Sequence, residues 1–146
     1  MPLPTPLSLA LHAGMVIPAT PLALNANRTL DERRQRALFR YYAEAGVGGI
    51  AVGVHTTQFA IRDPHVGLFE PLLALTQEEL NRLDVGRHTP LLRISGVCGD
   101  TEHAVREAEI ARDLGFHAGL LSLAALRDAP IERLIDHCNA VAQEIP

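Results

Sequence analysis

The chain alternates between short apolar runs and longer segments in which apolar residues recur at helical spacing. The apolar runs occupy residues 15–20, 48–54, 90–95 and 118–123. The run 48–54 is apolar at every position, which is typical of a strand that is buried on both faces of a parallel sheet. Each run precedes a helical segment, so the pattern predicts four strand–helix units joined by right-handed crossovers.

Start and stop signals frame the predicted helices. The first begins at Thr29, where residues 29–32 (TLDE) fit a capping box, and it ends at Gly46. The second covers 68–83, the third starts at a cap formed by Asp100 or Thr101, and the fourth opens at Pro130. The last helix is predicted to bury one apolar face made of Ile131, Leu134, Ile135, Cys138, Val141, Ala142 and Ile145.

A weak internal repeat supports regular units. Residues 43–50 and 111–120 each combine a helix end, a glycine stop and an apolar run, which implies about 35 residues per unit, as in a barrel. A complete doubly wound open sheet and half of a (β/α)8 barrel, which needs about 250 residues, both fit this α/β pattern. The absence of a G-x-G-x-x-G motif after the first strand weakens a dinucleotide-binding sheet, but periodicity alone leaves both architectures open.

Composition narrows the class of protein. The 146 residues are 47% hydrophobic and 21% charged with a formal net charge of −4, which indicates one globular domain, 1–146. The chain shows no basic patch, which argues against a nucleic-acid partner. Cys98 and Cys138 are interpreted as free thiols in a reducing cytoplasm. Residues 1–13 lack the positive start of a signal peptide, and no apolar run reaches the roughly 20 residues of a membrane span. We therefore expect a cytoplasmic protein without a membrane partner.

An ordered set of short motifs carries a family resemblance. Residues 16–22 (VIPATPL), 30–31 (LD), 46–53 (GVGGIAVG), 96–97 (GV) and 111–115 (ARDLG) together resemble the opening of the dihydrodipicolinate synthase/N-acetylneuraminate lyase family. The resemblance implies a partial (β/α)8 TIM barrel of about four βα units, the N-terminal half of an aldolase-like domain. It also implies a homo-oligomeric lyase that makes or breaks carbon–carbon bonds in 2-oxo acids, commonly through pyruvate held as a Schiff base on lysine.

The resemblance also points to substrate-binding residues. The family has a Gly-Thr-Thr-Gly-Glu turn after the second strand that holds the substrate carboxylate, and residues 53–58 here read GVHTTQ. Thr56 and Thr57 match the threonine pair if one extra residue precedes them, and the adjacent His55 is the best candidate for a further substrate contact. Neutral donors on a tight turn suit a carboxylate. The alternative interpretation is that both threonines are ordinary polar loop residues.

Two departures from the family concern catalysis. The family's tyrosine at the end of the fourth strand has no counterpart, because residues 122–126 read SLAAL, and Tyr41 and Tyr42 fall on the first helix as core or interface residues. All 13 basic residues are arginine, whose guanidinium cannot form an imine in place of lysine. We therefore assign no catalytic residue and no cofactor, and expect this chain alone to be inactive.

Other candidate sites are weaker. The histidines (His12, His55, His65, His88, His103, His117 and His137) lack the spacing of zinc ligands, so no metal site is predicted. Arg62 could bind an anionic substrate, although a pair with the adjacent Asp63 is favoured. Cys98 is expected to be an inert thiol and Cys138 a core residue. The charged run 31–36 is interpreted as a solvated helix face.

Three functions remain open at this stage. The leading hypothesis is the N-terminal part of a lyase that acts on a pyruvate-type 2-oxo acid, either as a truncated gene product or as a partial sequence. A rival is a non-catalytic half-barrel that self-associates or binds a partner, since four strands leave two open edges. The third is a small open-sheet enzyme of another class, which a topological switch point in the strand order would reveal.

Overall fold

The computed structural model describes residues 3–54 and 59–146. The helices are α1 (Thr5–Ala13), α2 (Glu32–Glu44), α3 (Phe69–Leu83), α4 (Thr101–Asp113) and α5 (Ile131–Glu144). The strands are β1 (Gly49–Val52), β2 (Leu92–Val97) and β3 (Ala118–Leu121), and the short 3-10 turns are η2 (Phe59–Arg62) and η3 (Ala124–Leu126).

The strands pair in chain order. Within the described residues the sheet runs β1-β2-β3, with both pairs parallel. The predicted first strand, 15–20, lies beside β1 as an extended segment, because Thr20 N donates to Ala51 O (2.8 Å) and Ala51 N donates to Pro18 O (3.0 Å). Pro18 has no N–H to donate, and the pairing is reduced to an isolated bridge between Ala19 and Ala51. The order shows no switch point, which argues against the open-sheet enzyme and agrees with a partial barrel.

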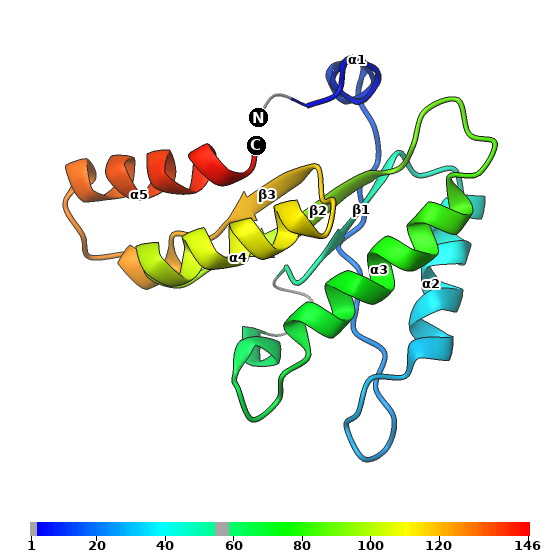
Figure 1. Cartoon of the computed structure of the whole chain (residues 1–146), viewed down its shortest axis with the longest axis horizontal. Helices are drawn as coiled ribbons and strands as arrows, with labels where there is room; N and C mark the ends of the chain where they lie inside the picture. The colour runs from blue at the N-terminus through cyan, green and yellow to red at the C-terminus, as the bar shows by residue number, and fades with distance from the viewer. Residues whose placement is uncertain (1–2, 55–58) are drawn as a thin grey trace.

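The helices that follow the strands pack in neighbouring pairs (Figure 1). α2 lies beside α3, and α4 lies beside α5. All four residues of β1 are buried, as expected for a strand covered on both faces. The alanines of α4 at 104, 108 and 111 are fully buried and let this helix approach β2 and β3 closely. A continuous core results, centred on Phe39, Ile50, Leu72, Leu73 and Leu91.

The helix boundaries confirm most start signals but not the first. Asp31, not Thr29, caps α2, with its Oδ1 accepting from Arg34 N at 3.0 Å. The capping box is wrong because residues 24 and 30 form an antiparallel bridge, and the Thr29 hydroxyl instead bonds Asn27 Oδ1 at 2.7 Å within that turn. Asp100 caps α4 as predicted, and its Oδ1 accepts from His103 N.

The internal repeat is confirmed by backbone geometry. Gly46 follows α2 and Gly115 follows α4, and each has φ near +82°. This left-handed conformation strains residues that carry a Cβ, so glycine ends both helices in the same way.

Two features of the chain ends differ from the prediction. Residues 5–13 form α1, which the proline-broken sequence had not indicated, and Leu7 of this helix is fully buried. On α5 only part of the predicted apolar face is covered: Val141 is buried, whereas Ile131 and Ile135 are 67% and 54% exposed. Cys138 is only partly buried, so its assignment to the core is wrong.

Among the described helices, none has both the length and the apolar character needed to cross a membrane.

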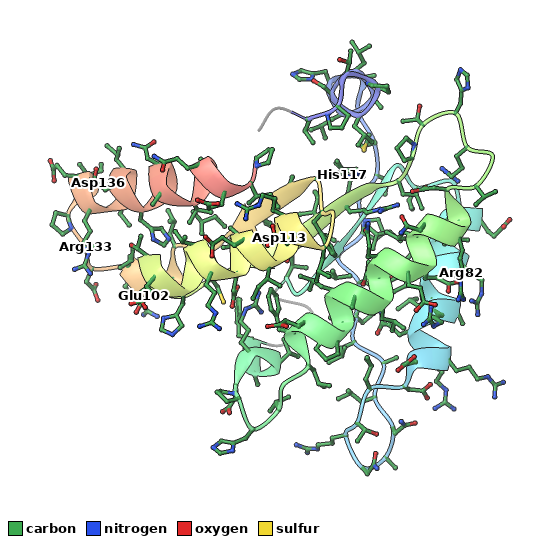
Figure 2. All side chains as sticks on the ribbon, viewed as in Figure 1. Arg82, Glu102, Asp113, His117, Arg133 and Asp136 are labelled. Carbon is green, nitrogen blue, oxygen red and sulfur yellow. The ribbon has the colours of Figure 1, made fainter. Side chains whose placement is uncertain are left out.

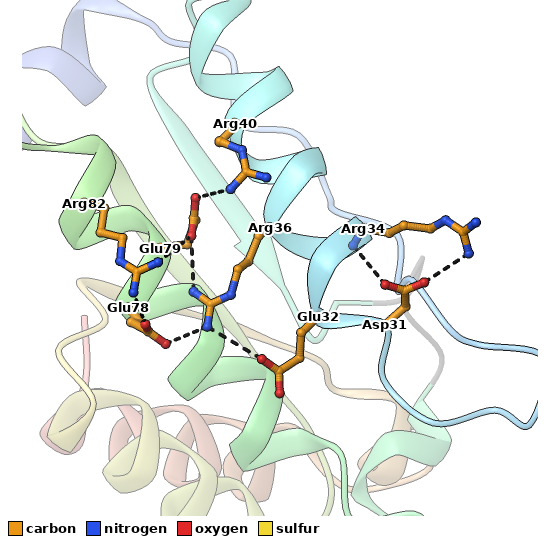
Figure 3. Close-up of polar contacts among 8 residues, drawn as sticks. All are labelled: Asp31, Glu32, Arg34, Arg36, Arg40, Glu78, Glu79 and Arg82. Atoms are coloured by element: carbon orange, nitrogen blue, oxygen red, sulfur yellow. Dashed lines mark hydrogen bonds and ion pairs between the residues drawn. The ribbon is translucent and has the colours of Figure 1, made fainter.

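The charged run 31–36 is not a uniformly solvated face. The Arg36 side chain is 18% exposed and reaches Glu79 on α3, a carboxylate whose side chain is 4% exposed (Figure 3). Glu79 receives hydrogen bonds from Arg36 (3.1 Å) and Arg40 (2.7 Å), and Arg36 also bonds Glu78 at 2.6 Å. This network ties α2 to α3, which explains why Arg36 turns away from water.

Candidate functional site

A small cavity lies where the strands end. It has a volume of about 180 Å³. Its lining comes from the carboxyl-terminal ends of the strands and from η2: Gly53, Val54, Phe59, Gly96, Val97, Leu120, Leu121 and Ser122. This volume is below the roughly 300–1,000 Å³ of drug-sized pockets, so the cavity suits a ligand of a few heavy atoms. Active sites of (β/α)8 barrels are built at this end of the strands.

Close backbone approach shapes one wall of the strand-end cavity. A Cβ atom on Gly96 would lie 2.2 Å from Gly53 O, so β2 can come this close to the end of β1 only with glycine at position 96. Gly53 itself has φ of +67°, which turns the chain away from β1. The two glycines therefore let the strand ends converge around the cavity.

Arg62 connects the elements around the strand-end cavity. Its Nη2 donates to Gly96 O at 3.0 Å, and its Nε donates to Glu107 Oε1 of α4 at 2.7 Å. Its guanidinium lies 4.6 Å from the centre of the Phe69 ring and 5.8 Å from that of Phe59, both distances within the range of a cation–π contact. The ion pair between Arg62 and Asp63 that the sequence favoured is therefore wrong.

Local turn geometry explains why Asp63 is not the partner of Arg62. The Asp63 Oδ1 accepts from His65 N at 2.8 Å, two residues ahead in the chain. Such short-range bonds to the backbone are a common use of aspartate in turns. The carboxylate that Arg62 needs comes instead from Glu107, 45 residues away in the sequence.

Cys98 lies next to this ion pair but is not an activated nucleophile. Its backbone N donates to Glu107 Oε2 at 3.0 Å. Burial raises the pKa of the Cys98 thiol, and the nearby Arg62 charge opposes this only in part. A thiol with a raised pKa carries little thiolate at neutral pH, which agrees with the predicted inert cysteine.

A larger groove lies on the other side of Arg62. It has a volume of about 570 Å³ and is lined by η2, the turn that follows it, the start of α3 and one side of α4. Arg62 and Glu107 both line this groove, and their side chains are each 12% exposed. The ion pair therefore stands between the groove and the strand-end cavity.

The predicted substrate residues His55, Thr56 and Thr57 lie outside the described residues, so their role stays a prediction. In the sequence they connect Val54 to Phe59, both of which line the strand-end cavity. Tyr41 and Tyr42 are on α2, away from the strand ends; Tyr41 is 68% exposed, and Tyr42 packs against the core.

The histidines in the described segments are dispersed. His137 is buried between α4 and α5 with its Nδ1 3.0 Å from Thr101 Oγ1, and His117 precedes β3. His103 interacts with its helix cap, Asp100, which raises the pKa of His103. Across residues 3–54 and 59–146, no three side chains of the His, Cys, Asp and Glu types lie together as a metal site would require.

Sequence reasoning missed Ser122 and Glu107. Ser122 directly follows β3, its N donates to Val97 O at 2.8 Å, and it is the polar side chain in the described lining of the cavity. Its place after an apolar run was a usable signal, because residues after parallel strands gather at one end of a barrel. Glu107 gave no such signal, since it reads as one of several acidic residues on a helix.

Comparisons with known proteins identify the fold. No protein-family model matches the sequence, and a search of curated proteins gives no significant match. Solved structures do match. They include DHDPS (dihydrodipicolinate synthase) from Cyanidioschyzon merolae with lysine bound (TM-score 0.76, 20% identity, 91% of this chain and 44% of that one). N-acetylneuraminate lyase from Fusobacterium nucleatum matches with a TM-score of 0.74 at 15% identity, over 89% of this chain and 42% of that one. CdNal from Clostridium difficile in complex with mannosamine matches with a TM-score of 0.75 at 15% identity, over 90% of this chain and 43% of that one.

These matches confirm the predicted resemblance at the level of the fold. The chain spans a little over two fifths of the length of the structures it matches, in agreement with the predicted N-terminal half. The partial (β/α)8 barrel is therefore confirmed.

Proposed function

We propose that this chain forms the carboxylate-binding part of a lyase that acts on a pyruvate-type 2-oxo acid. The strand-end cavity carries the proposal, because it lies where (β/α)8 enzymes build their active sites and has room for a small acid. The fold supports it, since the matching structures are DHDPS and N-acetylneuraminate lyases, one with lysine bound and another of the group with mannosamine.

Thr56, Thr57 and His55 are the proposed substrate contacts. The sequence joins them to Val54 and Phe59 on either side, and both neighbours line the cavity. Hydroxyl and backbone N–H donors hold a carboxylate without the desolvation cost of a buried ion pair. Ser122 adds a hydroxyl from the opposite strand end.

The chemistry of the chain by itself stops at binding. A Schiff base needs an amine that can lose its proton, and the sequence contains no lysine. Arginine stays protonated and cannot substitute. Carbon–carbon bond chemistry through an imine would thus need a lysine that this sequence does not hold.

The test is a titration of the isotope-labelled chain with pyruvate, followed by NMR. Saturable shifts are expected at the amides of Gly53, Val54, Phe59 and Ser122. T56V and T57V should each weaken binding about tenfold, the effect of losing one hydrogen bond to a charged group. T29V is the matched control, because the Thr29 hydroxyl bonds Asn27 in the turn before α2 and neither residue lines the cavity, and it should leave affinity unchanged.

Borohydride adds a covalent check to the same titration. Reduction in the presence of pyruvate should leave every internal residue unmodified, as judged by the mass of proteolytic peptides. Absence of saturable shifts at the four amides would contradict the binding proposal, and a pyruvate-sized adduct on an internal residue would contradict the chemical one.

A second candidate function, self-association of half-barrels, is supported by the edge of β3. Leu120 on this strand is 52% exposed, and Leu123 just after it is 40% exposed. Gly119 N donates to Pro146 O of the same chain at 2.7 Å, so one position on the outer edge of β3 is already paired, and a second copy would have to displace this contact. Pairing of this edge with the 15–20 edge of a second copy would close a sheet of eight strands.

A further inference from the structure

We propose that Arg62 is a positioning residue for the strand-end cavity, holding the ends of β1 and β2 at the separation that a small carboxylate requires. The identity of the ligand rests on the proposed function, whereas the geometry that Arg62 maintains does not. Arg62 is absent from the cavity lining, so it acts through its neighbours and not by touching the substrate.

Arg62 contacts the cavity wall from behind. Its Nη2 donates to Gly96 O at 3.0 Å, and the same nitrogen lies 3.6 Å from the place where a Cβ of Gly53 would be. Its guanidinium also faces the Phe59 ring. Gly53, Phe59 and Gly96 all line the cavity; Gly53 directly follows β1, Phe59 belongs to η2 and Gly96 belongs to β2. One side chain therefore fixes the separation of these elements.

Arg62 is itself anchored on its outer side. Its Nε binds Glu107 Oε1 at 2.7 Å, and Phe69 covers the guanidinium face. The second oxygen of Glu107 accepts from Cys98 N, two residues beyond Gly96. The Glu107 carboxylate thus braces the end of β2 directly and also through Arg62.

The shape of the guanidinium explains why arginine is needed. Nε and Nη2 donate in different directions, one to α4 and one to the strand end, and a lysine ammonium cannot reproduce this rigid fork. Glu107 neutralises the charge of Arg62, so the guanidinium acts by geometry and not as an ion-pair partner of the substrate.

The experiment compares R62Q and R62K with R34Q as the matched control. Arg34 also forms an ion pair, with Asp31, but its side chain is 75% exposed and lies on α2. Hydrogen exchange of the Cys98 and Gly96 amides reports the geometry without any ligand, and the pyruvate titration reports binding. Amides of Phe39 and Leu72, in the core between α2 and α3, report global stability.

R62Q should accelerate exchange at Cys98 about tenfold relative to the core amides and weaken pyruvate binding by a similar factor. R34Q should change neither. If R62Q does not fold, R62K decides the question, because an ammonium keeps the charge beside Glu107 but cannot also donate to Gly96 O as the guanidinium fork does. Unchanged relative exchange at Gly96 and Cys98 in the variant that folds would overturn the positioning role. Should the natural chain itself fail to bind pyruvate, the proposed function falls, whereas the exchange comparison still tests Arg62.

Discussion

His117 illustrates how a single half-buried residue couples the fold to pH. It stands at the start of β3 (Figure 2), where its Nδ1 accepts from Arg93 N at 3.1 Å. Burial lowers the pKa of His117, and the positive charge of Arg93 acts in the same direction. Since Nδ1 serves as an acceptor, the folded protein holds the neutral imidazole that carries its proton on Nε2.

We predict that His117 makes the protein less stable in mild acid. The unfolded chain takes up its proton near pH 6.5, whereas the folded chain does so only at lower pH. The free energy of unfolding therefore falls as pH drops below about 6.5, until the folded pKa is passed. H117N keeps an acceptor for Arg93 N but does not titrate, so the stability of the natural protein relative to H117N should decrease toward acid. Urea unfolding at several pH values measures this difference.

His103 provides a control of opposite sign. Asp100 raises its pKa through a hydrogen bond, so its stabilising effect is present below about pH 6.5 and disappears as pH rises through the folded pKa. The stability of the natural protein relative to H103N should accordingly increase toward acid. Parallel pH profiles for the natural protein and H117N would refute the role assigned to His117.

The contact between α2 and α3 shows how charge can join two helices. Glu79 is nearly excluded from water, yet Arg36 and Arg40 both bond its carboxylate. Arg82, one turn further along α3, lies 3.7 Å from it (Figure 3). A buried carboxylate is tolerated because its partners satisfy it, and removing one side of such a group leaves the other uncompensated.

We predict that E79Q destabilises the protein by about 1–3 kcal/mol, measured by urea unfolding at neutral pH. The value lies below that of a fully buried pair because Arg36 keeps its bond to Glu78. E32Q is the control: Glu32 also pairs with Arg36, but at 3.6 Å and with a side chain that is 64% exposed. It should change stability by less than about 0.5 kcal/mol. Equal effects of E79Q and E32Q would mean that burial of Glu79 contributes nothing.

At the scale of the whole molecule, the apolar surface is uneven. Leu120 and Leu123 near β3 and Ile131 and Ile135 on α5 are exposed, whereas the residues of β1 are fully covered. Arg133 and Asp136 lie on α5 as well (Figure 2), so this helix carries charged residues beside its exposed isoleucines. An apolar surface next to a sheet edge favours association over a monomer.

We predict that the chain forms a homodimer of twice 15.8 kDa through this surface, measured by light scattering over a range of concentrations. Negative charges introduced at the interface should prevent the two copies from associating, so the L120E/I135E variant should be monomeric. V85E changes a valine that is 82% exposed and follows α3, outside residues 15–20 and β3, and should leave the dimer intact. A natural chain that stays monomeric at every concentration would eliminate self-association.

Local patterns predicted the elements because the forces that set them act over a few residues. The glycine stops at Gly46 and Gly115 and the cap at Asp100 depend on neighbouring backbone groups. The Thr29 cap failed because a turn reaching back to residue 24 competed for that stretch. Part of the apolar face of α5 was wrongly predicted to be buried, because periodicity shows that a helix has an apolar face but does not show which element covers that face.

The sequence by itself determined the order of strand–helix units, the parallel sheet and the lack of an internal amine, since periodicity, glycine stops and composition are properties of nearby residues. Only the tertiary structure decided which charges meet and where the strand ends converge. Arg62 bonds Glu107, which lies 45 positions away in the sequence, and Arg36 bonds Glu79, which lies 43 positions away. Such partners are chosen by the packing of helices against the sheet, because many arginines and carboxylates are chemically equivalent until the fold brings particular ones within reach.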